Sequence, residues 1–124
     1  MIIECCNQIL NEFNGKVPAT IEELISLAGI GRKTANVILG SAFGKQTMGV
    51  DTHVLRVSNR LGIAHSKNPD KVEEELVNQF PEKKLTSINL ALVLHGRRTC
   101  KAKKPLCTDC VLYNACEWPE KESA

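Results

Sequence analysis

Apolar residues recur every three to four positions along most of the chain, and no stretch alternates in the way of a half-buried strand. This spacing is typical of amphipathic helices, so we expect an all-α protein. The expected helices cover residues 2–13, 20–27, 32–43, 52–61, 69–80 and 85–94.

Start and stop residues support these boundaries. Thr20 followed by Glu23 forms a capping box, and Asn68 before Pro69 places an N-cap ahead of a first-turn proline. Asp51 stands where the fourth helix needs an N-cap. Four of the expected helices are followed by a glycine, a typical stop signal: Gly15, Gly44, Gly62 and Gly96.

The chain of 124 residues is long enough for one compact domain, and it has no apolar run of membrane-spanning length. Its first residues lack the basic region and the long apolar stretch of a signal peptide. Six cysteines in such a chain fit a reducing cytosol better than secretion. We therefore expect a cytoplasmic protein, associated with the nucleoid if it is prokaryotic.

Four cysteines near the C-terminus are spaced C-x6-C-x2-C-x5-C: Cys100, Cys107, Cys110 and Cys116. Four thiolates in a short segment indicate a structural zinc or an iron–sulfur cluster. The gaps of six and five residues suit a zinc ribbon poorly, because a ribbon pairs two short C-x2-C knuckles, so the spacing favours the cluster. Two disulfides are disfavoured in a reducing compartment. The other two, Cys5 and Cys6, are expected in the core.

The net charge is only +2, but its distribution is uneven. Residues 24–69 hold six Lys and Arg with a single acid, and residues 95–104 hold five with none. Two basic blocks in an otherwise acidic chain suggest one face that binds a polyanion. Charge alone leaves ordinary solvated lysines and arginines as an equal alternative.

The segment Leu27-Ala28-Gly29-Ile30-Gly31-Arg32-Lys33 predicts a tight turn between two short helices. Glycines permit positive φ and close approach of another backbone, so the amides of residues 29–31 could face one phosphate. Ile30 is expected to pack between the helices and hold the turn. A flanking Arg-Lys pair makes a site for the DNA backbone more credible.

Lys33 is expected in the first turn of a helix, where the helix dipole disfavours a cation. The same dipole, with Arg32 adjacent, favours the neutral amine, which is the nucleophilic form. A phosphate-binding lysine without covalent chemistry is the alternative, and physical chemistry alone favours it.

Asp51 is the single acid of the first basic block, 18 residues after Lys33. Besides capping a helix, its carboxylate could assist proton transfer or stabilise positive charge on a sugar. His53 and His95 are interpreted as structural hydrogen-bonding residues rather than catalysts.

Four motifs in order resemble the endonuclease III family: residues 27–36 (LAGIGRKTAN), residues 50–53 (VDTH), residues 95–97 (HGR) and the four-cysteine loop. That family comprises helix-hairpin-helix DNA glycosylase/AP lyases. The resemblance runs from about Ile2 to Glu117. One departure is Ala28, where the family usually has proline. Lysine at position 33 separates this chain from the adenine-mismatch glycosylases of the same fold.

The resemblance implies an N-terminally truncated helix-hairpin-helix glycosylase fold with a [4Fe–4S] cluster on the four loop cysteines. It implies that Lys33 is the Schiff-base nucleophile and Asp51 the catalytic carboxylate. The implied activity is removal of oxidised pyrimidines from double-stranded DNA and cleavage of abasic sites by β-elimination. The expected DNA contacts are Gly29, Ile30, Gly31, Arg32, Arg97, Arg98, Lys101, Lys103 and Lys104.

We expect a partial helical domain over residues 1–96, with the hairpin at about 20–43, followed by the cluster loop and tail at 97–124. Family members are much longer, so the chain looks like a fragment, an internal start or one piece of a split gene. Its first helix should then expose apolar residues, which predicts aggregation or an N-terminal partner chain. A non-catalytic DNA-binding fragment, a remnant that does not fold alone and a zinc-ribbon interaction protein are the alternatives.

Overall fold

The computed structural model describes residues 1–122, and within that range it contains helices and turns but no strand. The elements follow in this order: α1 (Ile2–Glu12), α2 (Ile21–Ile25), α3 (Arg32–Ala42), α4 (Thr52–Leu61), α5 (Pro69–Gln79), η1 (Glu82–Lys84), α6 (Leu85–Arg98) and η2 (Cys107–Asp109). The all-α expectation is therefore confirmed. No described helix is both long enough and apolar enough to cross a membrane.

Local capping explains where three of the six α-helices in the described residues begin. Three predicted N-caps accept a first-turn backbone hydrogen bond: Thr20 from Glu23 (3.3 Å), Asp51 from Val54 (2.8 Å) and Asn68 from Asp70 (2.9 Å). Gly62 ends α4 at a φ of 88°, a left-handed conformation that glycine adopts without strain. The second helix is shorter than expected and ends at Ile25 rather than at residue 27.

The predicted end of the last helix was wrong, because α6 continues through Gly96 to Arg98. Gly96 is buried where α6 crosses α4. A Cβ atom there would lie 3.0 Å from the Cβ of His53 and 3.1 Å from Cγ2 of Val57. This glycine therefore permits a close helix crossing and does not stop the helix.

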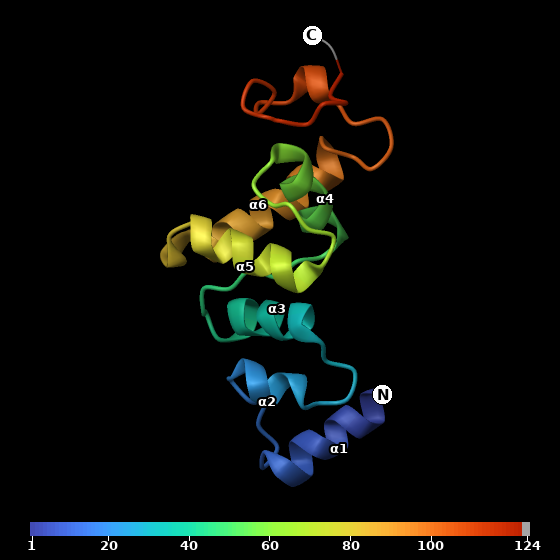
Figure 1. Cartoon of the computed structure of the whole chain (residues 1–124). Coiled ribbons are helices and arrows are strands. Elements are labelled where there is room, and N and C mark those ends of the chain that lie inside the picture. The colour runs from blue at the N-terminus through green and yellow to red at the C-terminus, as the bar shows by residue number, and fades with distance from the viewer. Residues whose placement is uncertain (123–124) are drawn as a thin grey trace.

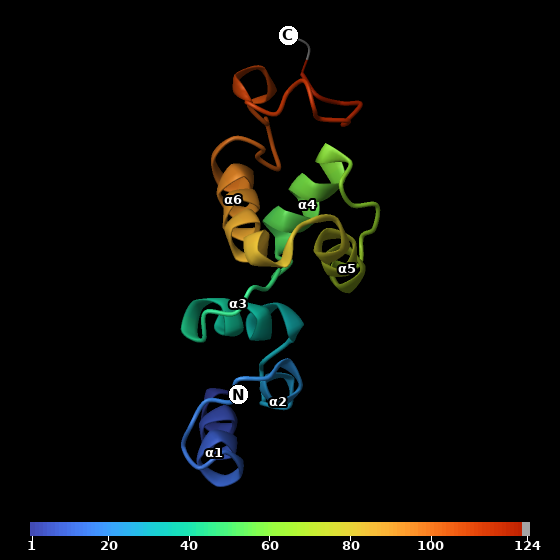
Figure 2. The ribbon, with the colours of Figure 1, turned by 90° about the vertical axis from the view of Figure 1, so that its left-hand side faces the viewer.

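The helices are stacked along one direction, from α1 at one end to the cysteine loop at the other (Figures 1 and 2). Two separate apolar clusters stabilise this stack. The hairpin cluster lies among α1, α2 and α3 and is built on Leu24, Leu27, Ala35 and Leu39. The α4–α6 cluster contains Met48, Val50, Val54, Val57, Ala64, Val72, Leu76, Leu85 and Leu92.

The contact between α3 and the α4–α6 cluster includes a buried polar network. Asn36 is 5% exposed, and its side-chain amide donates to the carbonyl of Met48 (3.2 Å) and to Glu73 (2.8 Å). Glu73 lies on α5 and also accepts two hydrogen bonds from Arg32, both of 2.8 Å. Because these bonds are directional, they set how α3 is oriented on the helices above it.

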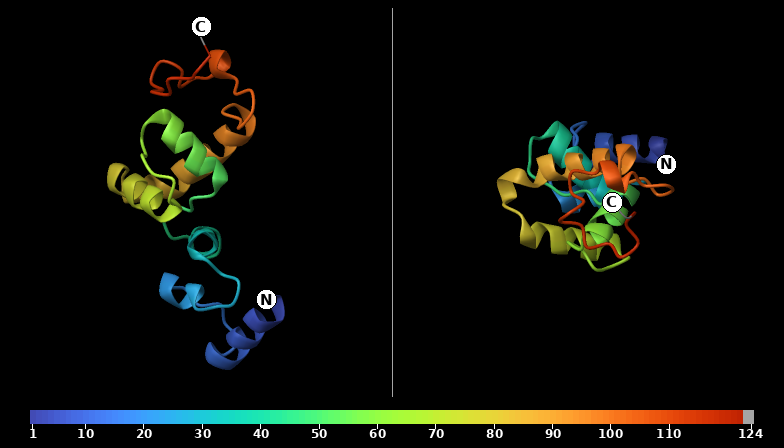
Figure 3. Two further views of the ribbon diagram at one scale, coloured as in Figure 1. Left: turned by 45° about the vertical axis from the view of Figure 1, so that its right-hand side comes forward. Right: turned by 90° about the horizontal axis from the view of Figure 1, so that it is seen from above.

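Helix α1 lies at the outer end of the stack (Figure 3) and has no fully buried residue. Its exposed apolar side chains include Ile2 at 81%, Ile3 at 76% and Leu10 at 65% exposure. The expected apolar exposure is therefore confirmed. Cys5 packs partly against the hairpin cluster, but Cys6 is exposed, so the expectation that both are core residues was wrong for Cys6. The two fall on different sides of the helix because neighbouring positions are about 100° apart.

We expect Gly96→Ala to destabilise the protein. Alanine inside a helix normally gains about 1 kcal/mol over glycine, but overpacking a close crossing costs about 1–3 kcal/mol. The Cβ of His53 is attached to the backbone of α4 and cannot rotate away. The urea midpoint of unfolding should fall.

Ala91→Gly is the control. Because position 91 is exposed on the same helix, this variant measures the difference in helix propensity between alanine and glycine without a packing effect. A Gly96→Ala variant more stable than the parent protein would show that the helices separate at little cost.

Candidate active site and cysteine pocket

The turn between α2 and α3 has the backbone geometry that its glycines predict. Gly29 has a φ of 80°, and the amide of Ile30 donates to the carbonyl of Leu27 (3.2 Å). Ile30 packs partly against the hairpin cluster, as expected. Gly31 is the N-cap of α3, makes no side-chain capping bond, and has open space where a Cβ would stand. The first amides of α3 therefore have no side-chain cap, and the turn beside them can be approached by an external group.

Lys33 is exposed in the first turn of α3. The neighbouring Arg32 forms a bidentate ion pair with Glu73, and this hydrogen bond raises the pKa of Arg32. The positive charge of Arg32, which was expected to favour the neutral amine of Lys33, is therefore compensated by the carboxylate of Glu73. Arg32 remains 45% exposed, but the structure places it on Glu73 rather than free for phosphate.

Asp51 caps α4 and contacts His53, whose Nδ1 lies 3.2 Å from its Oδ2. Its carboxyl is 19% exposed. Partial burial raises the pKa of Asp51, but hydrogen bonds from the Val54 amide and His53, with the charges of His53 and Lys33, bring the pKa below its ordinary value of 3.8. Asp51 is therefore held as a carboxylate, and it lies near enough to Lys33 for their charges to interact.

His53 was expected to be structural, and the structure places it against the candidate carboxylate. The local sequence signal for this contact is that His53 follows the N-cap residue Asp51 by two positions. A side chain at that position can turn back toward the cap.

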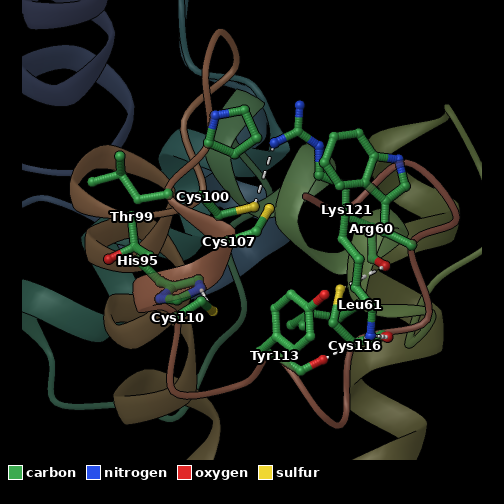
Figure 4. A pocket seen from close by; sticks show the side chains of 13 residues that line it. Arg60, Leu61, His95, Thr99, Cys100, Cys107, Cys110, Tyr113, Cys116 and Lys121 are labelled. Carbon is green, nitrogen blue, oxygen red and sulfur yellow. Dashed lines mark hydrogen bonds between the residues drawn. The ribbon is translucent and has the colours of Figure 1, made fainter. Parts of the chain in front are cut away.

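The four loop cysteines line one pocket between the ends of α4 and α6 and the C-terminal loop (Figure 4). All are partly buried and none is in a disulfide. Two of the sulfur atoms meet polar hydrogens: Arg60 Nη1 lies 3.4 Å from Cys100 Sγ, and the Leu112 amide lies 3.4 Å from Cys110 Sγ. Such donors stabilise thiolates. The Sγ of Cys116 lies 3.5 Å from the carbonyl of Arg60.

His95 also reaches this pocket, with its Nε2 3.4 Å from the Sγ of Cys110. Burial lowers the pKa of His95. The structural role predicted for His95 is consistent with this position, but its sulfur partner was not predicted.

Arg60 is a pocket residue that the sequence did not indicate. It donates to the carbonyls of Lys101 (2.8 Å) and Ala102 (3.2 Å), and its guanidinium stands 4.1 Å from the ring centre of Trp118. One arginine of α4 therefore contacts both the beginning and the end of the cysteine loop. These partners are about 40 or more positions from Arg60 along the chain, so no local sequence pattern predicts the contacts.

Five of the six expected basic contacts gather at one end of the molecule, and the sixth, Arg32, lies at the start of α3. The five are exposed, at the end of α6 and in the loop that follows it: Arg97, Arg98, Lys101, Lys103 and Lys104. The turn at residues 29–31 lies at another level of the stack, nearer to α1 (Figure 1). A ligand that touches both must therefore extend along the molecule.

Helices α2 and α3 with the turn between them belong to a known structural class. Residues 12–41 match the model of the helix-hairpin-helix motif. The chain is 47% identical to endonuclease III of Haemophilus influenzae and 46% identical to that of Escherichia coli, in each case over 97% of this chain and 57% of the relative. Endonuclease III of Thermotoga maritima is 44% identical over 94% of this chain and 55% of its own length.

Solved structures agree in fold. A trapped endonuclease III–DNA covalent intermediate, the estranged-adenine complex, has a TM-score of 0.90 and 38% identity over 94% of this chain and 55% of that one. A thermostable thymine-DNA glycosylase has a TM-score of 0.84 and 28% identity, covering 96% of this chain and 57% of that one. The resemblance to the endonuclease III family is confirmed, and the chain spans just over half the length of these relatives.

We expect Asp51→Asn to change how stability depends on pH. Because the pKa of Asp51 is lower in the folded state than in the unfolded state, its contribution is present above about pH 4 and is lost as pH falls through the folded pKa. The stability difference between the parent protein and Asp51→Asn should therefore shrink between neutral pH and about pH 2. Urea unfolding at several pH values measures it.

Asp51→Ser is the control, because serine also caps a helix and carries no charge. Its stability difference from the parent protein should shrink with falling pH in the same way as that of Asp51→Asn, because neither variant has a titrating group at this position. A difference that stays constant with pH would contradict a lowered pKa.

Proposed function

We propose that this chain carries the catalytic lysine and carboxylate of a base-excision-repair DNA glycosylase/AP lyase that removes oxidised pyrimidines. The observation that carries this proposal is the exposure of Lys33 at the start of the hairpin helix, beside the ionised Asp51. The similarity to endonuclease III supports it, including the similarity to a covalent intermediate with DNA.

Binding to the DNA backbone would use two groups of residues. The amides of Gly29, Gly31 and the first turn of α3 are suited to one phosphate, because the N-terminus of α3 has no side-chain cap and open space beside Gly31. The Ile30 amide would join them only by releasing the carbonyl of Leu27. Arg97, Arg98, Lys101, Lys103 and Lys104 would contact phosphates further along the duplex. Arg32 would join them only by exchanging Glu73 for phosphate.

The chemistry would proceed on a nucleotide flipped out of the stack. The neutral amine of Lys33 attacks C1′, the bond from C1′ to the base breaks, and the base leaves with a proton. The C1′–O4′ bond then breaks, O4′ takes up a proton, and the sugar ring opens to an iminium, the Schiff base between Lys33 and C1′. Removal of a C2′ proton then expels the 3′ phosphate and cuts the strand. Asp51 stabilises the developing positive charge and accepts protons at the sugar.

The four cysteines would hold a [4Fe–4S] cluster. In the described part of the chain, no three His, Cys, Asp or Glu side chains surround a position for a single metal ion. The four sulfur atoms nevertheless line one pocket that also offers Arg60 and an amide as donors. The C-x6-C-x2-C-x5-C spacing of these cysteines favours a multi-atom cluster over zinc. A bound cluster would cross-link the loop that carries the lysines.

Borohydride should trap this chain covalently on duplex DNA that contains an abasic site, because hydride reduces the Schiff base to a stable amine. Lys33→Ala should remove the trapped product entirely. Lys71→Ala, a matched loss of an exposed lysine on α5, should leave it unchanged.

Failure of the folded parent chain to form the product would reject the lyase proposal. If the chain still bound DNA, and if neutralising Lys101, Lys103 and Lys104 abolished that binding, the chain would be a non-catalytic DNA-binding fragment.

Anaerobically prepared protein should contain about four iron and four sulfide per chain and should absorb visible light. Cys107→Ser should lose most of the iron, whereas Cys6→Ser, a matched change of an exposed thiol on α1, should keep it. Colourless protein with one zinc per chain would reject the cluster.

A further inference from the structure

The segment that joins α3 to α4 passes between two helices and is bound by their side chains. We call residues 43–51 the linking segment. Lys33 lies on the helix before it, and Asp51 is its last residue. Thr86 of α6 accepts from the Thr47 amide (3.2 Å), and the hydroxyl of Thr47 donates to the carbonyl of Asn36 on α3 (2.6 Å). The path of this segment therefore determines how far apart the two candidate catalytic groups lie.

Gly49 of this segment is bound by one carboxamide at both of its backbone polar groups. The amide of Gly49 donates to Oδ1 of Asn89, and Nδ2 of Asn89 donates to the carbonyl of Gly49, both at 2.9 Å. Asn89 lies on α6, 40 residues away. Only a side chain with a donor and an acceptor on one planar group can make this pair of bonds.

Gly49 is also packed tightly against α3. A Cβ atom there would lie 3.4 Å from the carbonyl oxygen of Lys33 and 3.4 Å from Cγ2 of Val37. The residue is buried and stands two positions before Asp51. Its backbone is thus held between Asn89 on one side and the turn of α3 that carries Lys33 on the other.

We propose that Asn89 is a positioning residue for the Lys33–Asp51 pair. This inference rests on the proposed lyase function. By holding Gly49 against α3, Asn89 sets where α4 begins and so where the Asp51 carboxylate stands relative to the Lys33 amine. Displacement of a reacting group by about 1 Å can cost about 100-fold in rate.

The test is Asn89→Leu, which keeps the size of the side chain and removes both hydrogen bonds. The single-turnover rate of borohydride trapping at saturating DNA should fall by about 10- to 100-fold. Affinity for the DNA should not change, because Asn89 is not one of the proposed phosphate contacts. A rate equal to that of the parent chain would overturn the proposal.

Asn59→Leu is the control, because it removes the same pattern of hydrogen bonds at a different place. Asn59 makes the same two-sided contact with another backbone, because the Ser66 amide donates to its Oδ1 (3.2 Å) and its Nδ2 donates to the Ser66 carbonyl (2.9 Å). Asn59 lies on α4 near the end opposite to Asp51, so its loss should lower stability without slowing trapping. Equal slowing in both variants would reduce the role of Asn89 to general stability and overturn the proposal.

A second measurement does not depend on activity. In the parent chain, nuclear Overhauser contacts should join the α protons of Gly49 to the methyl groups of Val37, and the Gly49 amide should exchange slowly with solvent. Asn89→Leu should weaken the contacts and speed the exchange, whereas Asn59→Leu should do neither. If the parent chain fails to trap DNA, the lyase proposal fails, and unchanged contacts in Asn89→Leu would separately overturn the positioning role.

Discussion

The arrangement of this protein depends on the contact between α3 and the α4–α6 cluster. The described part of the chain has two apolar clusters that share no buried residue, so apolar burial stabilises each cluster but does not by itself orient one on the other. Asn36, which is buried, and Glu73, which is mostly buried, make directional hydrogen bonds across this contact. Removing either partner would leave buried polar groups unpaired, which is why such a contact favours one geometry.

The candidate active site lies across this same contact. Lys33 is on the side of the hairpin cluster, and Asp51 opens the first helix of the α4–α6 cluster. Neither group could be placed by its own helix alone. The contacts of the linking segment with both sides place the amine and the carboxylate together, so the chemistry proposed for them depends on polar bonds between elements rather than on either apolar core.

Helix α4 connects this site to the cysteine pocket. Its N-cap is Asp51, and near its middle it presents Arg56, which donates to the carbonyls of Gly96 (2.8 Å) and Cys100 (3.2 Å). Arg60 then contacts the loop itself and Trp118. A single helix with a close crossing at Gly96 therefore carries the candidate carboxylate at one end and supports the loop of basic residues at the other.

The sequence by itself determined the helical class, most helix boundaries, the caps at Thr20, Asp51 and Asn68, and the motifs that resemble endonuclease III, because these signals act within a few residues. The roles given to Lys33, Asp51 and the loop cysteines remain proposals based on those motifs. Only the tertiary structure decided that Gly96 lies inside a helix, that Arg32 pairs with Glu73, and that Asn89 holds Gly49. Each of these contacts joins residues about 40 positions apart, where spacing along the chain carries no information about which side chains meet.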